Sequence, residues 1–236
     1  LEDRLKHHFL YPHDPNYVLR MAVPTYDPHI ALAEMGEMIT KAQGEFYVRI
    51  DKLLEAKQDV SKADREEYKT IKAIRSIAKN GNYACQYGAG VARIAITAGI
   101  SRAQAEIVYK AYWDLNWAIR KIAGEQLVKE VHGQNWLYNP ISGFWYSLRY
   151  EKDRFSTLIQ VSASFVFDKW VYNYRSRRSQ LTAQFHDEVV LCAREDEEEA
   201  VTKLLKDSIE LTNNQLNLNR RLDIGVQSGK RYSEIH

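Results

Sequence analysis

Four residues at steps of four have side chains that suit the binding of a nucleotide: Arg75, Lys79, Tyr83 and Tyr87. On an α-helix, four residues turn about 400° and rise ~6 Å, so these side chains would form one slightly winding stripe. Arginine can fork onto phosphate oxygens, lysine provides a point charge, and an aromatic ring offers its face to a base. A solvated helix with two basic residues and core tyrosines would have the same spacing.

A second candidate is the run Gln184-Phe185-His186-Asp187-Glu188. Alternating apolar residues on both sides of it predict two strands joined by a tight turn: Leu181, Ala183, Phe185, Val189 and Leu191. Asp187 would then lie at the turn. A rigid carboxylate suits a hard cation such as Mg²⁺, which completes its shell with phosphates and water. Aspartate is also a good turn former without any ligand.

Helices are expected through the first half of the chain. Prolines and histidines make long regular elements unexpected in residues 1–28, and Asp27-Pro28 predicts a helix start. Further helices are predicted from Glu45, with a break at Asp59–Asp64, and from about Glu66 to Tyr87, ending at Gly88. A long helix is predicted from Arg102 to about Glu130.

The second half has a different character. Aromatic residues between positions 133 and 150 predict strands, and a mostly apolar helix is predicted from Arg154 to Tyr174. Strands at Gln180–Phe185 and Glu188–Ala193, a helix from Glu195 to Asn213 and a last strand at Arg221–Gln227 would follow. Helices followed by a small sheet with helices indicate an α+β fold.

The composition is that of an ordinary globular chain. Of 236 residues, 45% are hydrophobic, and 33 basic against 31 acidic residues leave a formal net charge of +2, which neither requires nor excludes nucleic acid. The longest apolar runs are too short to span a bilayer, so no membrane partner is expected. Cys85 and Cys192 lack metal-ligand spacing, which favours a reduced, cytoplasmic protein.

Taken together, the stripe and the run at residues 184–188 resemble motifs of the family A DNA polymerases, the bacterial polymerase I family. Within that family, the chain most resembles the phage replicative type. The stripe followed by Gly88 matches that family's fingers-helix motif, and residues 184–188 match its palm hairpin. Leu1-Glu2-Asp3-Arg4 resembles the tail of the other palm motif. The end of the chain, Tyr232 to His236, resembles the family's C-terminus. The similarity runs through nearly the whole chain in the correct order.

The resemblance implies a role for each matching residue. Asp187 would be a catalytic, metal-binding aspartate, Glu188 an auxiliary carboxylate, and Lys79 both catalytic and nucleotide-binding. Among the remaining nucleotide-binding positions, Arg75 would clamp the phosphates and Tyr83 would stack on the base. Glu2 would be the steric gate of the ribose pocket, which Tyr87 would close, and His29 would bind phosphate. The DNA-binding positions would be Arg4, Gln160, Gln184 and His186.

The resemblance also implies a division of the chain into subdomains and a set of ligands. Residues 1–26 would be the end of the first palm motif with its connection, 27–132 the fingers, and 133–236 the C-terminal part of the palm. The reaction would add dNTPs to the 3′ end of a primer-template DNA with two Mg²⁺ ions, or Mn²⁺ as a substitute. Asp187 and the row of cations would have to meet around the phosphates of one nucleotide. If the gene belongs to a phage, the cytoplasm would be that of the bacterial host.

One metal-binding aspartate of the family would lie four positions before Leu1. We therefore expect negligible activity from this chain alone. An N-terminal polypeptide with the rest of the palm, the thumb and, in some arrangements, an exonuclease would be its partner.

Some positions depart from the family pattern. Ser156 and Lys152 stand where Asn and Arg are common, and residues 40–68 look inserted, with a solvated helical pair as one interpretation and a contact with DNA or a partner as the other. Two other functions remain open: a non-catalytic DNA-binding or scaffolding subunit with the same fold, and an RNA-synthesising relative. Glu2 as gate argues for deoxynucleotides.

Overall fold

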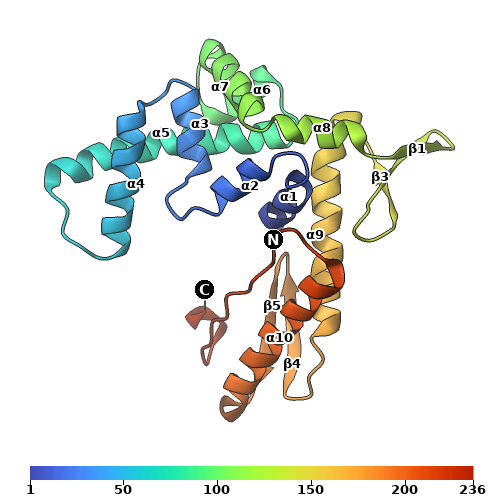
Figure 1. The fold of residues 1–236 in the computed structure, drawn as a ribbon. Helices are drawn as coiled ribbons and strands as arrows, with labels where there is room; N and C mark the ends of the chain where they lie inside the picture. The colour runs from blue at the N-terminus through green and yellow to red at the C-terminus, as the bar shows by residue number, and fades with distance from the viewer. Residues whose placement is uncertain (236) are drawn as a thin grey trace. The chain divides into compact units, whose positions relative to one another are not determined.

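The computed structural model describes residues 1–235, so the resemblance at His236 lies outside the described part of the chain. The chain divides into two compact units, whose elements are labelled in Figure 1. Unit 1 comprises Leu1–Tyr11, Leu127–Leu148 and Thr157–His236, and unit 2 comprises Pro12–Gln126 and Arg149–Ser156. Helices dominate, and the strands form two small antiparallel sheets, which confirms the predicted α+β class. Among the described residues, no helix is both long and apolar enough to span a bilayer.

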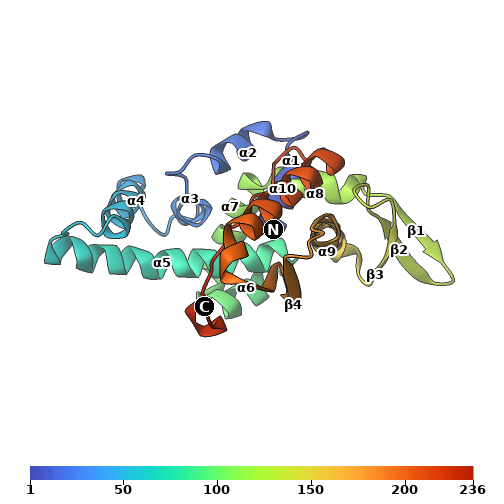
Figure 2. The ribbon, with the colours of Figure 1, turned by 90° about the horizontal axis from the view of Figure 1, so that it is seen from below.

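Unit 2 is helical. Its elements are α2 (Pro15–Met21), α3 (Pro28–Met35), α4 (Lys41–Glu55), α5 (Lys62–Gln86), α6 (Val91–Ala98), α7 (Arg102–Leu115), α8 (Trp117–Glu125) and the 3₁₀ turn η1 (Glu151–Asp153). The long helix α5 packs against α3, α4, α6 and α7, with α3 and α4 along one side of it (Figure 2). The predicted break at Asp59–Asp64 is confirmed, because α4 ends at Glu55 and α5 begins at Lys62.

Side-chain caps set several helix starts in unit 2. Asp27 Oδ1 accepts hydrogen bonds from the backbone N–H groups of His29 (2.8 Å) and Ile30 (3.1 Å), and Pro28 opens α3 as predicted. Asp14 caps α2 in the same way, accepting from Tyr17 N at 2.9 Å. The expectation that residues 1–28 form no long regular element is confirmed, since the helices there are short: Glu2–Leu10 and Pro15–Met21.

The segment at residues 40–68, which looks inserted, is tied to α5 by aromatic contacts. The rings of Tyr47 and Tyr68 stack at 5.0 Å and 7°, and both side chains are buried. Tyr68 Oη donates to Asp51 Oδ1 at 2.5 Å. Burial, with the hydrogen bond to Asp51 next, raises the pKa of Tyr68 well above its ordinary value. The segment is thus a folded helical element of unit 2.

The predicted helix from Arg102 to Glu130 is wrong as one element. It breaks at Asn116, whose buried side chain donates Nδ2–H to the carbonyl oxygen of Tyr112 at 2.9 Å. Asparagine side chains compete in this way with the helical backbone. The last residues of the predicted helix, Val128–Val131, form a strand instead.

Unit 1 mixes helices and strands. Its elements are α1 (Glu2–Leu10), β1 (Val128–Val131), β2 (Gln134–Tyr138), β3 (Trp145–Leu148), α9 (Arg154–Asn173) from Thr157 onward, β4 (Ser179–Phe185), β5 (Glu188–Ala193), η2 (Glu195–Glu197), α10 (Glu198–Leu216) and η3 (Tyr232–Glu234). Apolar residues of α1, α9 and α10 form its core, against which Val189 and Leu191 of β5 pack. Trp170 of α9 donates Nε1–H to Ser208 Oγ of α10 at 2.9 Å inside that core.

The first sheet has the order β1-β2-β3, with antiparallel neighbours. His132 and Gly133 connect β1 to β2 with φ values of +53° and +76°, the backbone signs that a two-residue hairpin favours. After β2, Asn139 is fully buried and donates Nδ2–H to Ser162 Oγ of α9 at 2.9 Å. That bond holds the sheet to α9.

The second sheet is the hairpin β4–β5, and both strands were predicted. Its register shifts between Leu181 and Ala183, so Leu181 lies opposite Leu191 while Ala183 lies opposite Val190. The bulge therefore puts Leu181 and Ala183 on opposite faces, where simple alternation had put them on one.

The predicted strand at Arg221–Gln227 does not form. Asn213 of α10 takes the place of a strand partner: its Nδ2–H donates to Leu222 O at 2.9 Å, and its Oδ1 accepts from Leu222 N at 2.8 Å. Leu222 is buried in the core of unit 1. A helix side chain thus satisfies the backbone that a neighbouring strand would otherwise bind.

Candidate functional site

Unit 2 gathers the predicted clamp residues along α5, which is one unbroken helix from Lys62 to Gln86. Arg75 Nε donates to Asp27 Oδ2 at 2.6 Å, and both side chains are largely buried. The Arg75 guanidinium also lies over the ring of Tyr47, 5.9 Å from its centroid. Burial alone would lower the pKa of Arg75, but Asp27, Tyr47 and Asp51 outweigh it and raise the pKa.

The next part of the stripe meets the start of α3. Asn82 Nδ2 lies 3.4 Å from His29 Nδ1, and the rings of His29 and Tyr83 are 5.9 Å apart. Lys79 Nζ lies 5.9 Å from the centroid of the Tyr83 ring. Four of the predicted nucleotide-binding residues therefore belong to one continuous cluster: His29, Arg75, Lys79 and Tyr83. Lys79 and Tyr83 are exposed, as contact with a ligand would require.

A hollow of about 430 Å³ lies at the end of α5. Tyr83, Tyr87 and Gly88 line it, together with two cations that the sequence interpretation did not place there, Arg93 and Lys152. Gly88 has φ +73°, and a Cβ there would meet the carbonyl oxygen of Lys152 at 3.3 Å. Arg93 could have been found from the sequence, because it comes just after the Gly88-Ala89-Gly90 helix stop. The position of Lys152 depends on tertiary packing alone and could not.

In unit 1, the turn of the β4–β5 hairpin consists of His186 and Asp187. His186 has φ +47°, and the side chain of Asp187 is 48% exposed. The backbone nitrogen of Leu1 lies 3.3 Å from Asp187 Oδ2, across 186 residues of sequence. The chain therefore brings Leu1, just before α1, to the hairpin turn.

A metal centre would need several carboxylate, imidazole or thiolate ligands close together. Among residues 1–235, no three or more His, Cys, Asp or Glu side chains are grouped so that they could hold a metal ion. Asp187 offers one exposed carboxylate with Glu188 beside it, which is less than a complete ligand set. These residues do not fit a metal centre by themselves.

The remaining predicted residues all lie in unit 1. Gln184 and His186 are exposed at the hairpin, and Gln160 is exposed on α9. Arg4 Nη1 donates to Arg221 O at 3.5 Å, and Glu2 opens α1. Asp187 and Arg75 lie in different units, so their meeting around one nucleotide stays a prediction.

Known proteins are similar to this chain in sequence and in fold. Residues 52–234 match the sequence profile of DNA polymerase family A. DNA polymerase I of Borreliella burgdorferi is 26% identical over 195 residues, which cover 72% of this chain and 20% of that protein. The chain therefore spans about a fifth of the length of that relative.

A solved structure has a similar fold. The POL domain of Pol1 from M. smegmatis, in complex with DNA primer-template and dNTP, matches 92% of this chain and 36% of its own, at 16% identity and a TM-score of 0.60. With the profile match over more than half of its residues, the chain belongs to DNA polymerase family A.

Proposed function

We propose that this chain is the nucleotide-binding and C-terminal catalytic portion of a template-directed DNA polymerase. The observation that supports it best is the cluster on α3 and α5, where His29, Lys79 and Tyr83 gather beside the Asp27–Arg75 pair. Cations followed by an aromatic ring along one helix suit a nucleoside triphosphate. In this proposal 27–132 are the fingers, and 1–26 and 133–236 belong to the palm.

The reaction is nucleotidyl transfer. The 3′-hydroxyl of the primer attacks the α-phosphate of a dNTP, and pyrophosphate leaves. Arg75 and Lys79 hold the triphosphate, with His29 beside them, and Tyr83 stacks on the base. Glu2 acts as the gate that excludes a ribose 2′-hydroxyl, and Tyr87 contacts the sugar. Arg4, Gln160, Gln184 and His186 contact the primer-template. Positioning and charge stabilisation provide most of the rate enhancement in such transfers.

Asp187 would hold a divalent metal ion through one carboxylate, with Glu188 as an auxiliary, and such an ion would supply charge neutralisation for the reacting oxygens. The described residues lack a complete ligand set. We therefore propose that the other ligands, with the thumb, come from polypeptide beyond these 236 residues, whether joined to the chain or separate.

Primer extension tests the proposal, measured with and without the N-terminal polypeptide that would carry the missing ligands and the thumb. The chain alone should be inactive, and the assembled enzyme should extend a primer with dNTPs in preference to rNTPs. Asp187→Asn should abolish extension and leave affinity for primer-template nearly unchanged, whereas Asp196→Asn, an exposed acid paired with Arg194, should be neutral. Robust extension by the chain alone would refute the need for further ligands.

A matched pair on α5 tests the nucleotide site. Lys79→Ala should raise the KM for dNTP, while Lys69→Ala should not, because Lys69 is an exposed residue of the same helix paired with Glu66. If the assembled protein binds DNA but never extends a primer, the chain is a scaffolding subunit instead. A loss of primer-template affinity that explained the whole defect of either site variant would contradict its assigned role.

A further inference from the structure

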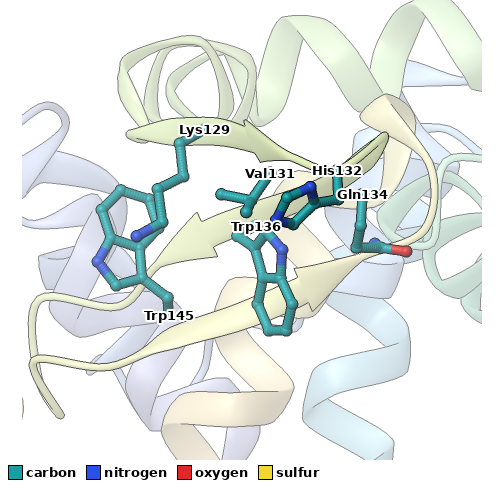
Figure 3. Close-up of a pocket in the computed structure, with 6 residues that line it drawn as sticks. All are labelled: Lys129, Val131, His132, Gln134, Trp136 and Trp145. Atoms are coloured by element: carbon teal, nitrogen blue, oxygen red, sulfur yellow. The ribbon is translucent and has the colours of Figure 1, made fainter.

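The β1–β3 sheet exposes an aromatic surface for which the polymerase proposal has no use. Six residues line a shallow depression of about 480 Å³ on it: Lys129, Val131, His132, Gln134, Trp136 and Trp145. Figure 3 shows the Lys129 and Trp145 side chains at one end and His132 beside Trp136 at the other. We call this surface the aromatic face. It lies within unit 1, away in sequence from every residue assigned above.

The register explains how the rings are arranged. Trp136 lies opposite Lys129 on β1 and Ser147 on β3, and Tyr138 lies opposite Trp145. Side chains alternate across a strand, so these residues share one side of the sheet. Leu137 and Leu148 point to the other side and are buried. One side of the sheet is therefore core, and the other carries two indole rings that are half-buried.

The rings are held in place by their neighbours. Lys129 Nζ lies 4.0 Å from the centroid of the Trp145 ring, and the Tyr138 and Trp145 rings are 5.3 Å apart at 53°. Gln134 Nε2 donates to Ser147 Oγ at 3.0 Å. The two-residue turn at positive φ projects His132 from the tip of the hairpin. An arrangement ordered before binding loses little side-chain entropy when a ligand arrives.

The charge of the aromatic face selects the occupant. Its lining contains a lysine and a histidine and no acidic residue. A lysine beside flat rings suits a polyanion whose bases are available for stacking. Trp136 and Trp145 are diagonal neighbours, so they lie about 7–8 Å apart. That is about twice the ~3.4 Å rise per nucleotide of a strand, which leaves each ring room for a base.

The geometry points to a binding site for single-stranded nucleic acid on the aromatic face, with Trp136 and Trp145 stacking on bases and Lys129 facing the phosphate backbone. Duplex DNA is a poor occupant because the faces of its bases are already stacked. The site is distinct from the nucleotide cluster of unit 2 and needs neither metal nor dNTP.

Fluorescence anisotropy of a labelled oligothymidylate of about 15 nucleotides, added to the 236-residue chain with a chelator and no dNTP, tests the site. Trp136→Ala and Trp145→Ala should each weaken binding about tenfold, since stacking contributes roughly 1–3 kcal/mol per base. Trp136→Phe should retain most of the affinity, which separates loss of stacking from loss of folding. Lys129→Ala should reduce the slope of log K against log salt by about 0.7.

Controls separate this site from the polymerase site. Trp117→Ala removes an exposed tryptophan of α8 and should leave oligonucleotide binding unchanged. Lys69→Ala and Asp196→Asn, at exposed residues outside the proposed polymerase site, should also bind normally. Because the assay contains neither metal nor dNTP, failure of the polymerase proposal would not affect this result. An oligouridylate of the same length distinguishes a general single-strand site from one selective for DNA.

Equal affinity of the tryptophan variants and the unchanged chain would overturn the inference, and so would a preference for duplex over single-stranded DNA. It would also be overturned if oligonucleotide binding were lost when the N-terminal polypeptide is added. The last would identify the aromatic face as a protein contact. Self-association that requires Trp136 and Trp145, without any binding of oligonucleotide, would identify it as a dimer contact and refute the nucleic-acid site.

Discussion

Arg75 and Asp27, 48 residues apart, form an ion pair at 2.6 Å whose carboxylate also caps α3. One oxygen of Asp27 accepts from the backbone of His29 and Ile30, and the other accepts from the guanidinium. The pair therefore fixes the start of the helix that bears His29 against the helix that bears Lys79 and Tyr83. The geometry of the nucleotide cluster depends on a single carboxylate.

Asp27→Asn should lower the free energy of unfolding by about 1 kcal/mol, because asparagine still caps the helix but cannot form the ion pair. Asp27→Ala should cost about 2 kcal/mol, since it loses the cap as well. Asp14→Asn is the control, because Asp14 caps α2 and no arginine among residues 1–235 forms an ion pair with it. Urea unfolding of the four proteins measures these differences. Equal losses for Asp27→Asn and Asp14→Asn would show that the pair adds nothing.

Gly88→Ala should destabilise unit 2 by about 2 kcal/mol or more, through two separate costs. The left-handed backbone at φ +73° disfavours a Cβ by about 1–2 kcal/mol, and that Cβ would also press on the carbonyl oxygen of Lys152. Gly99 has φ +68° with nothing within 4 Å, so Gly99→Ala pays only the first cost. The difference between the two variants in thermal unfolding isolates the contact with Lys152. Identical shifts would mean that the contact relaxes freely.

Acid should weaken unit 1 through His7. Burial lowers the pKa of this histidine below its ordinary value of 6.5, against the opposing charge of Asp3 and with smaller contributions from Lys6, Arg220 and Arg4. The unfolded chain then binds a proton at a higher pH than the folded chain. The stabilisation is complete above pH 6.5 and is lost as the pH falls through the folded-state pKa.

Urea unfolding at about pH 7.5 and about pH 5.5 checks this dependence. His7→Gln should reduce the difference between the two pH values but not remove it, because burial also lowers the pKa of His8. Stability that is the same at both pH values would contradict the assignment.

The two cysteines should differ sharply in reactivity. Cys85 is fully buried, and burial raises the pKa of its thiol to about 12, whereas Cys192 is exposed on β5. Thiolate is the reactive form. A disulfide reagent that releases a coloured thiolate should therefore modify one thiol per folded chain and two after unfolding. Cys192→Ser should remove the fast reaction, and a fast reaction that survived this change would place Cys85 within reach of solvent.

Local sequence rules predicted the parts of the fold that depend on neighbours along the chain. The caps at Asp27, the break before α5 and both strands of the β4–β5 hairpin follow from capping, turn and alternation patterns. The errors have tertiary causes: Asn116 interrupts a helical pattern with its own side chain, and Asn213 captures the segment expected as a strand. The bulge between Leu181 and Ala183 leaves no mark in the alternation of apolar residues.

The candidate site divides in the same way. The stripe on α5 follows from a four-residue period, which needs only a helix to become a row of side chains. The partners of that row come from other elements, so neither the Asp27–Arg75 pair nor the approach of Arg93 and Lys152 to the hollow could be predicted from spacing. The position of the half-buried rings of Trp136 and Trp145 likewise depends on which side of the sheet faces the core.

The length of α5 has a mechanical consequence. About 15 residues separate Tyr68 from Tyr83, which is a lever of ~22 Å at 1.5 Å per residue. Pivoting by about 10° around the stacked pair Tyr47 and Tyr68 would move Tyr83 through roughly 4 Å, more than the thickness of a nucleobase. A small rotation where α4 packs against α5 would thus become a larger displacement at Tyr83.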